Sequence, residues 1–341
     1  MTALSKATKT QSKPLRWLLN LPLWCFIIYW WGAFFFDEPY GGKALGNSIA
    51  SIIWLVCFAV GMKKLPYWWQ RASLTGIFVL IVAIPWLNIK ASNDLDWDQG
   101  FEQTGHVTID GDHYTFHNFR NFDYSLEGET TQNWTTRTVQ LSKLQGLDIF
   151  HDRFMGNLMA HPMLSFDFGD QGHICLSIET RREKGEFFNP LAAIYKKYEL
   201  MYIFGDERDH VRLRTNIRNE PVYIYKSAAS EELIRFLFTS SVDVQNSLST
   251  NPEFYNIFNA NCTTSIRNQI PEDQRSAFDI RILINGLLDQ LLYEEGSIVT
   301  EGLSFEQLRE RCFINETAQK HHNDDNFSQQ IRIGRPGQVK P

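Results

Sequence analysis

The stretch HPMLSFDFGDQGHICLSIET, residues 161–180, has the alternating pattern of two β-strands joined by a short turn. Its apolar residues stand at every second position on each side of the turn: Leu164, Phe166, Phe168, Ile174, Leu176 and Ile178. Strict alternation is typical of strands that bury one face against a core. The segment Gly169–Gly172 between them is rich in turn residues. The stretch therefore predicts a β-hairpin with one buried face.

The other face of this hairpin carries polar side chains: His161, Ser165, Asp167, His173, Ser177 and Glu179. Residues that pair in a ladder share a face, so odd positions must pair with odd positions. A three-residue turn closed by Phe168 and Gly172 sets His161 opposite Glu179, whereas a five-residue turn sets it opposite Arg181. In the first register the carboxylate can hold one imidazole nitrogen while the other faces a nucleophile. The alternative is a solvated polar face without chemistry.

A second polar cluster, NANCTTSI at residues 259–266, runs into a segment with helical character. If Asn261 caps this helix, Cys262 lies in its first turn, where unpaired N–H groups and the helix dipole favour a thiolate. A nucleophilic cysteine needs such a position. The same stretch also fits a buried apolar cysteine before a capped helix, or a chance Asn-x-Thr sequon.

Short β-type runs recur between residue 106 and residue 225, and helical patterns follow them. The expected strands are 106–109, 113–119, 163–168, 173–180, 200–204, 211–215 and 222–225, and the expected helices are 230–247, 262–270, 280–292 and 304–317. Because the order shows no βαβ alternation and no Gly-rich phosphate loop, it predicts an α+β domain. The tail from Lys320 is polar, and we expect it to be poorly ordered.

Three apolar runs precede this domain, from Trp17 to Phe36, from Ala44 to Met62 and from about Ala72 to Ile89. Each is close to the ~20 residues that a helix needs to cross a bilayer, and none contains an Asp, Glu, Lys or Arg. The basic residues that flank the runs are Lys6, Lys9, Lys13, Arg16, Lys63, Lys64 and Arg71, while the first loop has Asp37, Glu38 and Lys43. The positive-inside bias places the N-terminus in the cytoplasm, and three spans place the following domain in the periplasm of a Gram-negative cell.

The charged residues are distributed differently before and after residue 90, where the apolar runs also end. The net charge is -6, yet residues 1–90 hold nine basic and two acidic side chains, so the acidic excess lies in the remainder. An acidic soluble part argues against a nucleic-acid binder, and five Cys in 341 residues exclude a disulfide-dense module. We therefore expect a membrane anchor at 1–90, a soluble domain at 91–335 and a tail at 336–341. Cys175 and Cys312 could pair, leaving Cys262 free.

Two mixed-charge runs were weighed as binding sites, Arg181–Glu186 and Asp206–Asp209 with Arg212 and Arg214. Such runs are usually salt-bridged solvated faces or ion pairs that hold loops in place, so neither run is counted among the catalytic residues. A metal site built from His161, His173 and Asp167 lacks the usual ligand spacing, so no metal and no cofactor are expected.

Six motifs in this order resemble a known family. They are NFRNFDY at 118–124, AHPMLSF at 160–166, SIETRREKGE at 177–186, YELMY at 198–202, DERD at 206–209 and NCTT at 261–264. Together they are similar to a bacterial periplasmic domain noted for one His and an Asn-Cys-Thr motif, the periplasmic domain of the Lnb type of lipoprotein N-acyltransferase. The resemblance covers roughly residues 93–335. It implies a permuted papain-like, NlpC-like thiol-enzyme fold, in which the His strand precedes the Cys helix.

The resemblance implies that Cys262 and His161 act as nucleophile and base, with Glu179 as orienter, Asn261 and Thr263 near the oxyanion, and Ser177 in support. A membrane-tethered thiol acyltransferase would take an acyl chain from phospholipid and pass it to an amine such as a lipoprotein N-terminus. One departure is that the spans precede the domain here, whereas the Lnb enzymes carry further helices after it. Two alternatives stay open: a cysteine amidase or peptidase acting on envelope peptide, and a non-catalytic envelope binding module.

Overall fold

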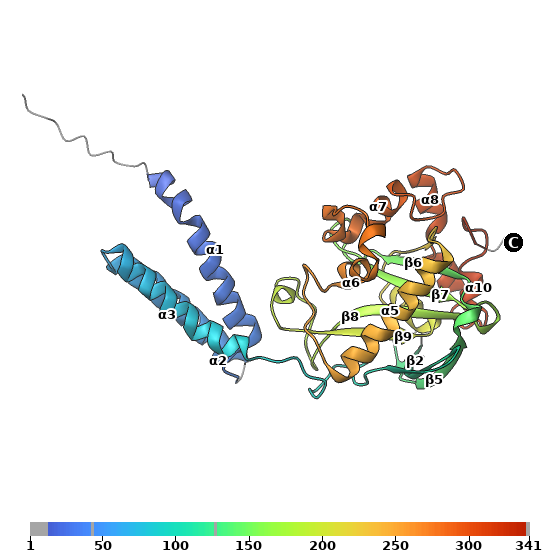
Figure 1. The fold of residues 1–341 in the computed structure, drawn as a ribbon, viewed down its shortest axis with the longest axis horizontal. Coiled ribbons are helices and arrows are strands. Elements are labelled where there is room, and N and C mark those ends of the chain that lie inside the picture. Colours follow the sequence, from blue (N-terminus) through green and yellow to red (C-terminus); the bar gives the residue numbers. More distant parts are fainter. Residues whose placement is uncertain (1–12, 42–43, 126–127, 339–341) are drawn as a thin grey trace, which may run out of the picture. The chain divides into compact units, whose positions relative to one another are not determined.

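The computed structural model describes residues 13–41, 44–125 and 128–338, and it divides into two compact units, one up to Lys90 and one containing the sheet (Figure 1). Lys6, Lys9 and Lys43, which entered the topology prediction, and the last three residues of the tail lie outside the described residues. Each unit is considered separately below.

The first unit consists of three helices, α1 (Lys13–Asp37), α2 (Ala44–Lys64) and α3 (Trp68–Leu87). Two of them, α2 and α3, are long and apolar enough to cross a membrane, while the apolar part of α1 that the search covers, Leu21–Asp37, is shorter. Within the unit, Trp54 stacks on Phe58 and contacts Phe78 of α3. The structure therefore supports two of the three expected spans by length and composition, as expected of a membrane anchor.

The second unit contains a mixed eight-stranded sheet in which β1-β2-β9-β8-β7-β6-β10 are neighbours and β5 pairs with β2. Its strands are β1 (His106–Asp110), β2 (His113–Arg120), β5 (Trp134–Gln140), β6 (Gly146–Asp152), β7 (His161–Asp167), β8 (His173–Arg181), β9 (Glu199–Gly205) and β10 (Val222–Lys226). Two short strands, β3 (Asp123–Tyr124) and β4 (Thr130–Thr131), form a separate pair. Sheet and helices together confirm an α+β fold.

The β7–β8 hairpin has the predicted register. Ser165 pairs with Cys175 and Met163 with Ser177, and the Phe168 N–H donates to the Gly172 carbonyl at 2.9 Å across a three-residue turn. The same register places His161 opposite Glu179. Gly172 has a φ of 80°, a conformation that favours glycine.

One face of the sheet is covered by α5 (Glu231–Thr250), which begins at the Ser230 cap and crosses the strands in Figure 1. Phe238 of α5 lies within ring-contact distance of five aromatic side chains from three strands and one turn: Tyr114, Phe116, Phe166, Phe168 and Phe204. These are the alternating apolar positions of the strands. This face is the aromatic core.

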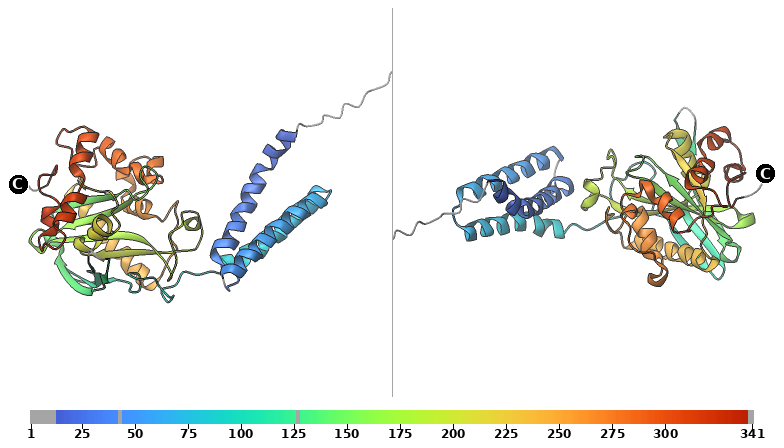
Figure 2. Two further views of the ribbon diagram at one scale, coloured as in Figure 1. Left: turned by 180° about the vertical axis from the view of Figure 1, so that it is seen from behind. Right: turned by 90° about the horizontal axis from the view of Figure 1, so that it is seen from above.

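The opposite face is covered by α4 (Glu207–Arg212), the π-helical turn η4 (Leu213–Ile217) and the C-terminal helices α9 (Asn315–Lys320) and α10 (Phe327–Gln330); seen from above, helices flank the sheet on both sides (Figure 2). Ser165 and Ser177, on the polar side of the hairpin, are fully buried here. The alternative of a solvated hairpin face is therefore wrong.

Several expected elements differ in the structure. Residues 211–215 form the end of α4 and most of η4 instead of a strand, and β5 and β6 were not predicted. The expected helix 280–292 is interrupted, with turns η6 (Ile280–Ile282) and η7 (Asn285–Leu287) before α7 (Leu288–Glu294). The expected helix 304–317 divides into α8 (Phe305–Cys312) and α9.

The expectation of a poorly ordered tail from Lys320 is also wrong for the part that the structure describes. Phe327 of α10 and Ile331 are fully buried in an apolar core cluster that also contains Val211 of α4, and Arg332 is almost fully buried. An apolar pair at i and i+4 explains this docking, because both side chains face the same side of a helical turn.

Candidate functional site

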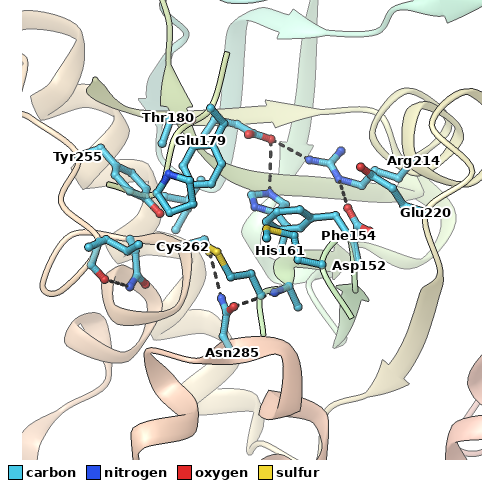
Figure 3. A pocket seen from close by; sticks show the side chains of 18 of the residues that line it. Asp152, Phe154, His161, Glu179, Thr180, Arg214, Glu220, Tyr255, Cys262 and Asn285 are labelled. Carbon is cyan, nitrogen blue, oxygen red and sulfur yellow. Dashed lines mark hydrogen bonds and ion pairs between the residues drawn. The ribbon is translucent and has the colours of Figure 1, made fainter. Parts of the chain in front are cut away.

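A cavity of about 470 Å³ lies where β7 begins and β6 ends, and its lining includes the side chains shown in Figure 3. Three elements bring the predicted residues to it: Cys262 from α6 (Cys262–Gln269), His161 from β7 and Glu179 from β8. Cys262 is more than 80 positions from both His161 and Glu179 in the sequence, yet all three line one cavity.

Cys262 is the first residue of α6, a helix that packs against β7 and β8. The Asn261 side-chain oxygen accepts the N–H groups of Thr263 (2.8 Å) and Thr264 (2.7 Å), while the Thr264 hydroxyl accepts the Asn261 N–H. This capping box fixes where the helix begins. Cys262 is 6% exposed, with its sulfur at the end of the helix that carries the positive partial charge.

His161 is held from the side of β8. Its Nε2 lies 2.7 Å from Ser177 Oγ and 3.4 Å from Glu179 Oε1. Ser177 in turn donates to Glu179 Oε1 at 2.6 Å. The Cys262 side chain also acts on this imidazole and raises its pKa.

Arg214 completes the arrangement from η4. Its Nη2 donates to Glu179 Oε1 at 2.8 Å and to Ser177 Oγ at 3.3 Å, and its Nε lies 3.3 Å from Asp152 Oδ2. Asp152 pairs with His161 in the β6–β7 ladder. The strands thus set Asp152, His161 and Glu179 in one row, and the guanidinium bridges the two carboxylates at its ends (Figure 3).

The charges in this row support one another. Burial lowers the pKa of His161, but the Glu179 charge and hydrogen bonds with Cys262 and Glu179 raise it to about 9. Burial acts to raise the pKa of Glu179, but His161 and Arg214 hold it well below its usual range. At neutral pH the pair is therefore an imidazolium beside a carboxylate.

Two further side chains surround the sulfur. Asn285 Nδ2 lies 3.6 Å from Cys262 Sγ and 2.9 Å from Thr263 Oγ1, and its Oδ1 accepts the Ala160 N–H at 2.8 Å. The Tyr255 hydroxyl accepts the backbone N–H of Cys262. Burial and the nearby charges of Cys262 and Glu179 raise the pKa of Tyr255 well above its usual value, so it keeps its proton.

Asn261 and Thr263 were expected near the oxyanion, but their hydrogen bonds lie within the helix cap. The Asn261 amide donates to the Ile257 carbonyl at 2.6 Å, and the Thr263 N–H donates to Asn261, so both groups are engaged in the helix cap. Asn285, Tyr255, Asp152 and Arg214 line the same cavity and were missed from the sequence. The sequence signal for Asn285 is the glycine that follows it. A Cβ at Gly286 would lie 2.4 Å from the backbone of Asn157, so only glycine permits this close approach.

The interpretation of the two charged runs as solvated faces is wrong for several of their members. Arg181, Glu207, Asp209, Arg212 and Arg214 are each at most 2% exposed. Each is paired: for example, Asp209 accepts two hydrogen bonds from Arg120, and Arg332 pairs with Glu207. Buried charges need such partners.

The proposed pairing of Cys175 with Cys312 does not occur. Both thiols are free and buried, and they belong to separate core clusters, Cys175 to the cluster that contains Phe327 and Cys312 to the one that contains Tyr225. Cys262 is the cysteine among these three that lines the cavity. In the part of the chain that the structure describes, no group of three His, Cys, Asp or Glu side chains is placed to hold a metal ion.

Both apolar and cationic side chains line the cavity. Apolar side chains line one part of it: Phe154, Met155, Met159, Phe188, Ile257 and Leu283. Arg182 and Arg218 provide cationic groups, in addition to Arg214. A ligand with an apolar chain and an anionic group would match both kinds of wall.

Comparison with known proteins agrees with the resemblance seen in the motifs. Residues 130–286 match the family model of the Lnb N-terminal periplasmic domain. The matched range contains His161, Glu179, Arg214 and Cys262. No curated protein and no solved structure matches the chain.

Proposed function

We propose that this chain is a membrane-anchored periplasmic thiol acyltransferase, which moves an acyl chain from a phospholipid to an amine such as the N-terminus of a lipoprotein. The observation that carries the proposal is the shared cavity of Cys262, at a capped helix N-terminus, and His161, held by Glu179. A thiol, a base and an orienting carboxylate are the parts that nucleophilic acyl transfer needs.

In the first half-reaction the Cys262 thiol passes its proton to His161, and the resulting thiolate attacks the ester carbonyl of the donor. The C–O bond then breaks, the lysophospholipid alkoxide takes the proton of the His161 imidazolium, and a thioester remains on Cys262. The raised pKa of His161, about 9, keeps this proton available at neutral pH, because Glu179 stabilises the charged ring. Arg214 and Ser177 hold Glu179 in place for this task.

The tetrahedral intermediate needs donors for its oxyanion. Asn285 Nδ2, 3.6 Å from the sulfur, and the protonated Tyr255 hydroxyl are the side-chain donors that we assign to it. Asn261 and the Thr263 N–H have their hydrogen bonds within the helix cap. Loss of one such donor typically costs about 100- to 1,000-fold in rate.

The donor class is supported by the surroundings of the cavity. The apolar wall suits an acyl chain, and Arg182 and Arg218 suit a phosphate. Exposed apolar side chains also occupy the segments that line it: Met155, Leu158, Phe187, Leu191, Phe258 and Ile284. Large exposed apolar side chains around a site are typical of a surface that meets lipid.

The anchor fits the same substrates. Two helices, α2 and α3, have the length and apolarity of membrane spans. Both the phospholipid and a lipidated acceptor stay in the bilayer, so a tethered domain meets them at high effective concentration.

The experiment is to incubate the full chain, in detergent micelles, with a phospholipid carrying an isotope-labelled acyl chain and to search the Cys262 peptide for the labelled thioester by mass spectrometry. We expect the label in the wild type and its loss in Cys262→Ser and His161→Ala. Cys312→Ser, which removes another buried cysteine, is the matched control and should keep the label.

Labelling that persists at other sites in Cys262→Ser, or an acyl-free Cys262 in the wild type, would contradict the proposal. Reaction of Cys262 with peptide substrates and not with phospholipid would instead favour the amidase or peptidase alternative.

A further inference from the structure

Besides Glu179, the cavity is lined by the carboxyl group of Asp152, one oxygen of which has no hydrogen-bond partner among the described residues. Asp152 is 1% exposed, and its Oδ2 faces Arg214 Nε while its Oδ1 has no hydrogen-bond partner in the described part of the chain. Glu220, just before β10, also lines the cavity, and its Oε2 likewise lacks a hydrogen bond. A buried oxygen without a donor is costly unless a ligand or a proton satisfies it.

The two carboxyl groups lie together. The charge of Glu220 is one of the influences that raise the pKa of Asp152, after burial and against the Arg214 charge, to about 7. The charged groups that face them are Arg214 from η4, His161 from β7, and Arg218, whose Nη1 lies 3.9 Å from Glu220 Oε2. Asp152 can therefore gain or lose a proton close to neutral pH, beside the Glu220 carboxyl group.

Proton balance gives this pair a task in the acyl transfer proposed above, on which the present inference rests. In the second half-reaction the acceptor enters as an ammonium ion and leaves as an amide, so its nitrogen must lose two protons. His161, neutral after the first half-reaction, can take one of them. A second base must take the other before the nitrogen lone pair can attack.

We propose that Asp152 and Glu220 form the binding site for the acceptor ammonium and take its first proton. The freed amine attacks the thioester carbonyl on Cys262. The C–S bond then breaks with its electron pair going to Sγ, and His161 takes the second proton from nitrogen, which restores the imidazolium and thiolate pair. Asp152 is suited to this step because it is the ladder neighbour of His161 and lines the same cavity as Cys262.

The test separates the two half-reactions in the full chain. Glu220→Gln keeps the shape of the side chain and should leave formation of the labelled Cys262 thioester as in the wild type. Transfer from the thioester to glycinamide, an amine that is mostly protonated at pH 7, should fall about 100-fold, the usual contribution of a general base. Glu310→Gln, an exposed glutamate on α8, is the control and should transfer at the wild-type rate.

Hydroxylamine is the decisive probe, because it is largely unprotonated at neutral pH and needs no such base. Glu220→Gln should release the thioester to hydroxylamine at a rate within about two-fold of the wild type. In the wild type, transfer to glycinamide should rise as the pH passes about 7. In the variant it should rise only as glycinamide itself loses its proton, closer to about pH 8. Asp152→Asn should behave as Glu220→Gln does toward the two nucleophiles.

Three outcomes are informative. Equal slowing with glycinamide and hydroxylamine would mean a structural role for the pair and would overturn the inference. Wild-type transfer to glycinamide in both variants would also overturn it. Absence of the thioester in the wild type would instead refute the proposed function, and it would leave the acceptor step without a substrate.

Discussion

The face of the sheet beneath α5 is filled with aromatic rings, whereas the face beneath α4 and η4 combines an apolar cluster with a set of buried, paired charges. On the first face Phe238 contacts rings from several strands. On the second, Arg120 pairs with Asp209, Arg332 with Glu207 and Asp148, and Arg214 with Asp152 and Glu179. Both faces are buried, but their stability depends on different properties. The stability of the first depends on how well its side chains pack, and that of the second on the geometry and protonation of its ion pairs.

This difference explains why the candidate site lies where it does. The Glu179 carboxylate raises the pKa of His161, and the buried guanidinium of Arg214 holds that carboxylate in place, which an apolar surface could not do. The cost is that each charge depends on its partners. The comparison can be tested by removing one side chain from each face and measuring stability in the full chain.

Removal of Arg214 should have the largest effect. Arg214→Met leaves Asp152 and Glu179 buried without their shared partner, which should cost about 4 kcal/mol, within the range for breaking a buried ion pair. The readout is the reaction of the fully buried Cys175 thiol with a maleimide, followed at the peptide level, because this thiol reacts when the sheet domain opens. Its rate should rise about a thousand-fold, and the Cys262 thioester should be lost.

Arg218→Met is the control for that variant. Arg218 is partly exposed, so its replacement should change stability by no more than about 0.5 kcal/mol. A wild-type Cys175 rate in Arg214→Met would show that the charged face does not depend on this bridge.

Phe238→Ala should have the next largest effect. Truncation removes a ring that contacts several others and leaves a cavity, at a cost of about 3 kcal/mol. The Cys175 rate should rise about a hundred-fold, while the Cys262 thioester still forms in the folded molecules because Phe238 does not line the cavity. Phe236→Ala, which alters an exposed ring of the same helix, should leave the rate nearly unchanged. Equal rates in the two variants would contradict the assignment of the aromatic core.

The sequence predicted the aromatic face and the Cys262 helix better than the charged face. Alternation in residues 161–180 and the Asn261 cap are local signals, so the hairpin register and the start of α6 follow from neighbouring residues. The strand expected at residues 211–215 arose because Val211, Leu213 and Thr215 alternate with arginines. The segment is helical because Asp206 caps α4, accepting the Arg208 N–H.

Arg214 and Asp152 were missed for a different reason. Their partners come from β6, β8 and η4, and nothing local shows that these segments meet. A mixed-charge run therefore resembles a solvated surface until the fold supplies the opposite charges. Long-range pairing is thus the part of the site that one sequence does not reveal.

The smallest effect, and the sharpest test of the comparison, is the pH dependence of stability between about pH 7 and pH 10. The pKa of His161 is raised to about 9 from an unfolded value near 6.5, so its contribution is fully present below about 6.5 and is lost as the pH rises through about 9. The wild type should lose about 2 kcal/mol over this window. Glu179→Gln removes the carboxylate that raises this pKa, so its opening free energy, from Cys175 labelling corrected for thiol ionisation, should be nearly flat with pH. Phe238→Ala should keep the wild-type slope while lying below it at every pH, because packing does not titrate. A slope that persists in Glu179→Gln would place its origin in another group and would show that the charge of His161 is not held by Glu179.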